Sequence, residues 1–334
     1  MPSEGRRFMS TMRKVFIDGG AGGASPAFWD HAWDAVNLDV ELMRMREGLD
    51  PVVRLVAERV QPGARVLEAG CGSGRVLAFL RELGCRAVGL DFAVEALSEA
   101  RRRLGAPPMV AGDVTRLPFR DGSFDCVVSL GVVEHFEEGP RSALQEHRRV
   151  MGNGGLLLLS VPRLSPLKRW VDWRRSLFAP GGLYRSWRGL AVRSVKRFGS
   201  DPPGRTPRSD LSFYQYEFPH EVIVGALRAA GFAPVTVVPT GISLGLREIG
   251  LVRLAFDRLM AARAEGLEEG QVAALPPGRR VRLFAMLRRV FGSEQFSGPL
   301  ERSMVRLLQL ASGHMYFVVA RAQHIEREAA AAQA

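Results

Sequence analysis

The chain has few cysteines and no long apolar run. These absences argue against a disulfide-stabilised scaffold and against a membrane-spanning protein. Three cysteines in 334 residues, at 71, 85 and 126, show no metal-ligand spacing and are too few for a disulfide scaffold. No stretch approaches the roughly 20 apolar residues of a membrane span, and no apolar run follows Arg6-Arg7 as it would in a signal peptide. We therefore expect a cytoplasmic protein without disulfides.

Two nucleotide-binding signatures are also missing. The glycine-rich segment Glu68-Ala69-Gly70-Cys71-Gly72-Ser73-Gly74 follows an apolar run at 65–67. No Gly-Lys-Ser/Thr closes it, which excludes a P-loop, and Arg75 stands where a dinucleotide fingerprint has its third glycine. The segment still reads as strand, tight turn and helix. Such a turn lets a cofactor approach the backbone closely and meet the helix N-terminus.

The pattern Glu-x-Gly-x-Gly-x-Gly resembles the first motif of the class I methyltransferases that depend on S-adenosylmethionine (SAM). Further landmarks follow in order: Asp91 ends a second expected strand, Asp113 lies in a third, and two more strands follow up to Pro162. This resemblance runs from about residue 63 to 162. The later run of aromatic residues, helix, Gly-Phe and strand at 213–238 is similar to small-molecule methyltransferases of the ubiquinone/menaquinone type. The class I resemblance implies an α/β fold with a doubly wound, mostly parallel, seven-stranded sheet, and SAM as the cofactor, which leaves as S-adenosylhomocysteine (SAH).

The resemblance also implies a role for each motif residue. Glu68 would organise the loop and the methionine ammonium, Asp91 would hold the ribose hydroxyls, and Asp113 would accept the adenine amino group. Val114 would meet the adenine ring through its backbone and Phe92 would pack on its face. The other expected cofactor-binding residues line the loop and the methionine side: Ala69, Gly70, Cys71, Gly72, Gly74, Leu130 and Gly131. Cys71 could be a reactive thiol or simply a small residue beside the cofactor.

A general base is needed only if the methyl acceptor must lose a proton. The candidates are His135, after the fourth strand, and Tyr214 and Tyr216, after the first insertion. His135 could equally cap a helix or pack beside the cofactor, and the tyrosines could be pocket wall. The other histidines show no metal-ligand spacing, so we expect no metal.

The chain divides into a core and two insertions. In related methyltransferases, N-terminal helices close over the cofactor pocket, so Trp29 and Trp33 either do this or pack an ordinary amphipathic helix. The expected segments are a flexible leader (1–26), N-terminal helices and SAM-binding core (27–162), a basic aromatic insertion (163–212), continued core (213–242), a helical insertion (243–313), and the last strand and tail (314–334).

The first insertion carries most of the net charge of +11, because twelve basic residues but three acids lie between Arg163 and Asp210. Aromatic and basic residues alternate at 167–178 and recur at helical spacing at 184–197. Three interpretations follow: peripheral contact of 163–198 with an anionic membrane surface, nucleic-acid binding, or a lid with solvated charges. Nucleic acid is less favoured, because the loop at 129–132 lacks both the Asn/Asp-Pro-Pro-aromatic element and the Pro-Cys nucleophile of base methyltransferases.

We therefore expect a SAM-dependent methyltransferase with a small, hydrophobic or lipid-like acceptor, the methylated atom being O, N or C. The alternatives are a non-catalytic SAM-binding regulatory or assembly protein, and an RNA-directed methyltransferase that uses the basic insertion.

Overall fold

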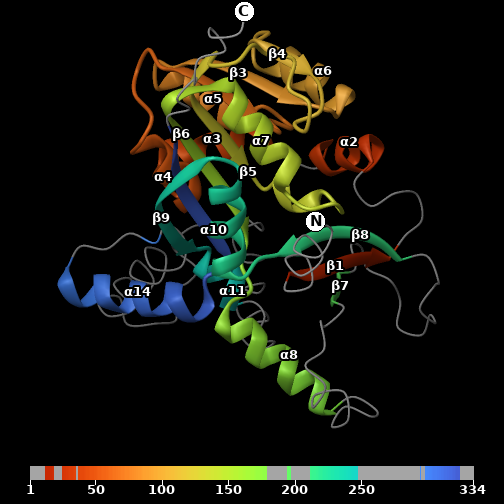
Figure 1. Ribbon diagram of the computed structural model, residues 1–334, viewed down its shortest axis with the longest axis vertical. Helices are drawn as coiled ribbons and strands as arrows, with labels where there is room; N and C mark the ends of the chain where they lie inside the picture. The colour runs from red at the N-terminus through yellow and green to blue at the C-terminus, as the bar shows by residue number, and fades with distance from the viewer. Residues whose placement is uncertain are drawn as a thin grey trace, which may run out of the picture.

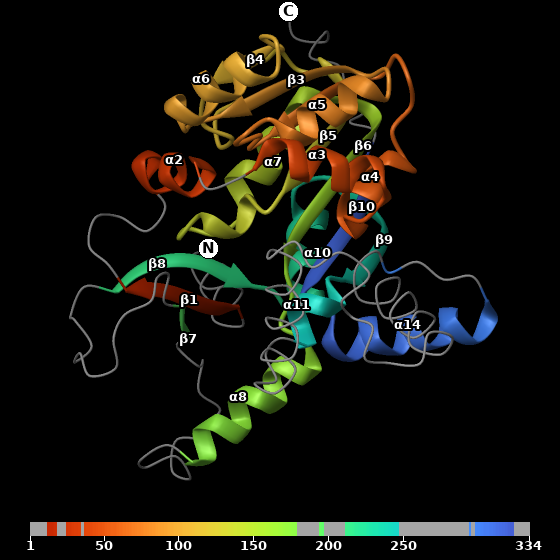
Figure 2. The same cartoon turned by 180° about the vertical axis from the view of Figure 1, so that it is seen from behind.

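The computed structural model describes residues 12–18, 25–34, 37–178, 194–196, 211–246, 294 and 298–323. Seven strands form one sheet in the order β4-β3-β2-β5-β6-β10-β9 (Figures 1 and 2). Strand β10 runs antiparallel to its neighbours β6 and β9, and the other pairs are parallel. The expected doubly wound, mostly parallel sheet is confirmed.

Each strand of this sheet overlaps a segment where the sequence predicts one, although Asp113, expected within the third strand, lies two residues beyond the end of β4. The parallel strands are buried on both faces, which is why they read as apolar runs and not as alternating patterns. The seven strands of the sheet are β2 (Arg65–Ala69), β3 (Arg86–Asp91), β4 (Met109–Ala111), β5 (Phe124–Leu130), β6 (Met151–Pro162), β9 (Phe232–Thr240) and β10 (Met315–Ala322).

Helices cover both faces of the sheet. The expected N-terminal helices include α2 (Pro26–Asp34) and α3 (Leu38–Arg46), and α3 begins after Asn37, which caps it by accepting the N–H of Val40. The others near the sheet are α4 (Pro51–Ala57), α5 (Arg75–Glu82), α6 (Val94–Arg103), the short η1 (Val133–His135), α7 (Arg141–Val150) and α10 (His220–Ala229).

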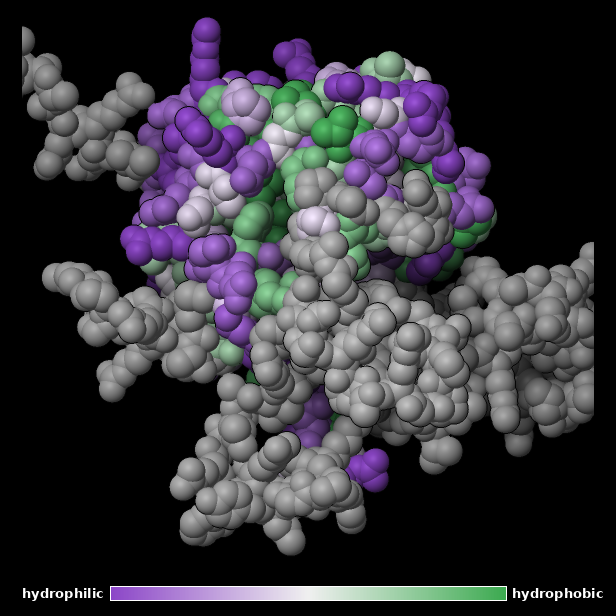
Figure 3. All heavy atoms as spheres, turned by 90° about the vertical axis from the view of Figure 1, so that its right-hand side faces the viewer, coloured by the Kyte–Doolittle hydropathy of each residue, from purple (hydrophilic) through white to green (hydrophobic). Residues whose placement is uncertain are grey.

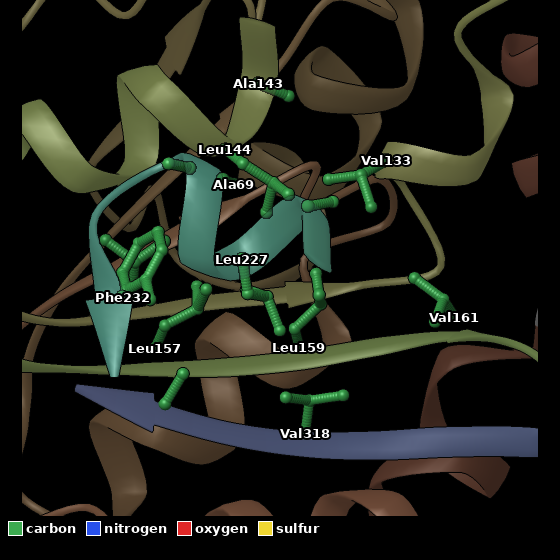
Figure 4. Close-up of a cluster of buried hydrophobic side chains, with 14 of the residues drawn as sticks. Ala69, Val133, Ala143, Leu144, Leu157, Leu159, Val161, Leu227, Phe232 and Val318 are labelled. Atoms are coloured by element: carbon green, nitrogen blue, oxygen red, sulfur yellow. The ribbon is translucent and has the colours of Figure 1, made fainter. Parts of the chain in front are cut away.

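The hydrophobic core lies between the sheet and these helices. On one side, Leu157 and Leu159 of β6 and Val318 of β10 lie beneath Leu227 of α10 and Phe232 (Figure 4). On the other side, α4 and α5 bury Val56, Leu77 and Leu80 against the sheet. Full burial of each such side chain stabilises the fold by about 1.5–3 kcal/mol, so the sheet is held from both faces.

A second, three-stranded sheet has the order β7-β1-β8 and corrects two expectations. Residues 1–26 are not only a leader, since β1 (Arg13–Asp18) pairs antiparallel with β8 (Leu211–Glu217) and buries Val15. Segment 213–242 does not wholly continue the core, because β8 belongs to this smaller sheet. Val195, expected in a helix, lies instead in strand β7 (Ser194–Lys196). Strand β7 pairs in parallel with β1.

Helix α8 (Pro166–Phe178) begins the basic insertion and is tied to the small sheet by buried charges. The Lys168 ammonium donates to Glu217 Oε1 at 2.6 Å, and both side chains are buried. Arg13 pairs with Asp172 and lies 3.5 Å from Glu217 Oε2. Lys168 is therefore not one of the surface cations that the sequence predicts, because it neutralises a buried carboxylate.

The second insertion is described at its ends. It contains α11 (Ile242–Leu246), the buried Glu294 and α14 (Pro299–Ser312). The rest of the expected helical insertion (247–293 and 295–297), the basic segment at 184–193 and the tail from 325 lie outside the described residues. Within the described part of the chain, no helix is long and apolar enough to cross a membrane.

Candidate functional site

The glycine loop joins β2 to α5 at the carboxyl edge of the sheet, where open α/β sheets bind ligands. Gly70, Gly72 and Gly74 all have positive φ, of 82°, 47° and 72°, a conformation that side chains rarely adopt. A Cβ at Gly70 would overlap the Val132 side chain, and one at Gly72 would overlap the Trp33 ring. The loop therefore needs glycine for its backbone conformation and for close packing.

Asp91 closes the loop from the end of β3. Its carboxylate accepts the N–H of Gly72 at 2.7 Å and the N–H of Ala93 at 2.9 Å. Burial raises the pKa of this carboxyl, while the backbone donors favour its ionised form. Each carboxylate oxygen has a second lone pair, so the group can accept a diol as well as shape the loop.

Glu68 lies beneath the loop and is almost fully buried. Its Oε2 has no hydrogen-bond partner among the described residues. Burial raises the pKa of Glu68 to about 8, although the nearby Arg75 favours the charged form. A buried carboxyl with an unused oxygen fits a cationic ligand group, because such a group would supply the missing charge and donor.

The residues expected at the adenine and methionine sides lie at neighbouring strand ends. Val114 is buried, Asp113 is exposed and accepts the N–H of Thr115, and the Phe92 ring stands 38% exposed just after β3. Leu130 ends β5, and Gly131 follows with a φ of 73° and donates to the Ser160 carbonyl. Their roles remain predictions, but all lie along the same edge as the glycine loop.

The Cys71 thiol is buried within the loop. Burial and the neighbouring Glu68 and Asp91 carboxyls raise its pKa well above the usual value. A thiol that stays protonated is a poor nucleophile, so the site favours the small-residue interpretation of Cys71.

An aromatic cluster lies beside the loop, formed by Phe28 and Trp29 of α2, His135 of η1 and Tyr214 of β8. The Trp29 and His135 rings are 4.7 Å apart and edge-on, and His135 and Tyr214 are 4.9 Å apart. Trp29 lies nearly parallel to Tyr214, with ring centroids at 6.3 Å. We call Trp29, His135 and Tyr214 the aromatic wall.

The backbone orients His135 within this wall. Its Nδ1 lies 2.7 Å from the Tyr214 carbonyl oxygen, which can only accept, so Nδ1 carries a proton. Nε2 is then the acceptor nitrogen when the ring is neutral, and it lies 3.9 Å from Glu134 Oε1. Burial and Glu134 raise the pKa of Tyr214 to about 12. Tyr214 therefore stays protonated at neutral pH, whereas His135 has the tautomer that a base requires.

Tyr216 lies apart from this pair. It is fully buried, its hydroxyl donates to the Glu137 carbonyl at 2.7 Å, and Lys14 lies 5.7 Å from its ring. Burial raises its pKa as well. The structure thus brings together two of the three expected catalytic residues and gives the third a packing role.

Sequence reasoning did not place Phe28 and Trp29 with His135. The signal was present, since α2 carries aromatic residues at 28, 29 and 33. Local patterns could not reveal which distant elements they face.

Seen from the side on which α2 lies in Figure 1, hydrophobic side chains gather over the upper and central part of the described surface (Figure 3).

Comparison with known proteins agrees with this geometry. Residues 67–159 match the methyltransferase domain family. The chain is 36% identical over 145 residues to the demethylmenaquinone methyltransferase of Beutenbergia cavernae, covering 42% of this chain and 57% of that protein. It is 34% identical over 136 residues to human "Probable tRNA methyltransferase 9B", covering 38% and 29%. The chain thus spans from under a third to just over half of these relatives.

Among solved structures, phosphoethanolamine N-methyltransferase 2 of Haemonchus contortus, in complex with SAM, has a TM-score of 0.46 at 15% identity. That match covers 90% of this chain and 58% of the other. No group of His, Cys, Asp and Glu that could hold a metal occurs among the described residues. The family match shows a methyltransferase domain at residues 67–159, and the strand order and the glycine loop agree with the class I fold, whose cofactor is S-adenosylmethionine.

Proposed function

We propose that this protein transfers the methyl group of SAM to a small, apolar or lipid-like acceptor bound against the aromatic wall. The observation that carries the proposal is the position of the wall: Trp29, His135 and Tyr214 come from three separate elements and meet beside the glycine loop. Apolar and aromatic pocket walls with a few polar atoms are typical of small-molecule sites.

The residues present fit the cofactor that the domain uses. Glu68 would meet the methionine ammonium, Asp91 the ribose hydroxyls, and Asp113, Val114 and Phe92 the adenine, with Leu130 and Gly131 on the methionine side. When bound, SAM supplies an electrophilic methyl carbon on a positively charged sulfur. The protein's own part is to orient the acceptor in line with that carbon and to exclude water.

His135 would move the acceptor's proton where there is one. Its Nε2 would take the proton of a hydroxyl or amine while the acceptor atom bonds to the methyl carbon and the carbon–sulfur bond breaks, its electron pair staying on sulfur. Tyr214, protonated and partly buried, would serve as wall and hydrogen-bond donor.

We further propose that α8 brings the protein to an anionic membrane surface, from which a lipid-like acceptor would come. Arg169, Trp170, Trp173 and Arg174 are exposed, and the Arg174 guanidinium lies 5.7 Å from the Trp170 ring. The one acid of the helix, Asp172, turns inward to Arg13. A face with two indoles, two arginines and no acid suits the interface of an anionic bilayer.

Vesicle co-sedimentation tests the membrane part. We expect salt-sensitive binding to anionic vesicles but not to neutral ones. Binding should fall by about 30-fold when Arg169 and Arg174 become Glu, since each cation contributes about 1 kcal/mol. The matched control is Arg102→Glu, a 70% exposed arginine on α6. Equal binding by the double variant would contradict the proposal, and binding to tRNA in its place would favour the RNA-directed alternative.

A further inference from the structure

Helix α2 contacts both halves of the candidate site. At its C-terminal end, the Trp33 ring packs on the glycine loop so closely that a Cβ on Gly72 would overlap it. One turn earlier, Trp29 packs edge-on against His135 and nearly parallel to Tyr214. Trp29 and Trp33 also stack on each other, with ring centroids at 6.2 Å.

A third contact fastens α2 to the cofactor side. The Asp30 carboxylate accepts the N–H of Ala96 at 3.0 Å, in the first turn of α6. The N-cap residue of α6, Ala93, has no side chain that could do this. Asp30 therefore caps α6 from another helix, and its negative charge interacts favourably with the positive N-terminal end of the α6 dipole. Helix α6 begins just after Asp91 and Phe92, the residues expected to meet the ribose and adenine.

A nine-residue helix is about 13 Å long and moves as one body, so a shift at Trp33 or Asp30 also shifts Trp29. We propose that α2 couples the two half-sites: Trp33 and Asp30 are positioning residues that hold Trp29 against His135 and Tyr214 when the glycine loop is occupied. The cofactor would then bind first and order the acceptor wall. This inference rests on the proposed function, because it takes the aromatic wall as the acceptor site.

Hydrogen exchange with SAH as the probe tests the coupling without knowledge of the acceptor. In the full chain, saturating SAH should slow exchange of the amides of η1 and β8 by about tenfold, the size of a typical coupling free energy. Asp30→Ala removes the oxygen that accepts the Ala96 N–H, and in this variant the same SAH saturation should slow exchange of these amides less than about twofold. The control Asp39→Ala changes an exposed acid on α3 and should behave as the unaltered chain.

A second variant guards against misfolding of the first. Trp33→Leu keeps Asp30 in place, and its SAH response at β8 should also be lost while SAH still binds. If β8 responds to SAH equally in both variants and in the unaltered chain, or in none of them, α2 does not couple the half-sites. Failure of the unaltered chain to bind SAH at all would overturn the cofactor assignment itself, so the two failures are distinguishable.

Discussion

The cofactor half and the acceptor half of the site are built in different ways. The cofactor half uses one continuous unit, β2, the glycine loop and α5, and the ends of neighbouring parallel strands. The acceptor half is assembled from α2, η1 and β8, which lie far apart in the chain and meet through ring contacts. The first depends on backbone conformation and the second on side-chain packing, so mutations should separate them.

The largest expected effect is on the cofactor half. Gly72→Ala places a Cβ against Trp33 at a φ of 47°, so SAH affinity should fall by more than about 100-fold, or about 2.7 kcal/mol. Gly105→Ala is the control, since Gly105 has a similar φ of 70° but open space around it. Titration calorimetry with SAH measures both. Tight binding by Gly72→Ala would show that the loop tolerates a side chain.

Mutation of the proposed acceptor half should lower methyl transfer more than it lowers SAH affinity. Trp29→Leu removes an indole from the wall, so methyl transfer should fall by about 10–100-fold. SAH affinity should fall by no more than about tenfold, which is the coupling expected through α2. Phe119→Leu serves as control, because it removes a ring that packs on Phe124 at the start of β5. A weaker SAH affinity together with unchanged transfer in Trp29→Leu would reverse the division of the site.

A smaller effect sharpens the role of Glu68. With its pKa raised to about 8, this carboxyl is mostly protonated in the free protein at pH 7 and would have to ionise to pair with the methionine ammonium. SAH binding should therefore release a proton and strengthen as pH rises toward 8, by up to about tenfold per unit. Calorimetry in buffers of different ionisation enthalpy counts the proton.

Glu68→Gln should bind SAH with no such proton release. The same shift acts on the stability of the unliganded chain. The carboxyl ionises near pH 4.5 in the unfolded chain and near 8 in the folded one. The folded state therefore binds more protons between these values, and the free energy of unfolding falls as the pH rises from 4.5 to 8. Proton release that persists in Glu68→Gln would assign it to another group.

The two halves also differ in how far the sequence predicts them. Glu68, the three loop glycines and Asp91 lie at fixed offsets around consecutive strands, so local pattern and strand order predict their positions in the fold. Strand β1 was missed because its partner β8 lies far along the chain and a glycine-rich segment follows it. The same distance hid the meeting of Trp29 with Tyr214, and the burial of Lys168 depended on Glu217, which no local pattern links to it.

The most direct test of the account follows the methyl group itself. The protein would be incubated with methyl-labelled SAM in three separate reactions, which contain a membrane lipid extract, a pool of water-soluble metabolites or tRNA as the source of acceptor. We expect label in a product of the lipid extract, and much less label with Trp29→Leu. Label in tRNA, or none in any pool although SAH binds, would contradict this expectation.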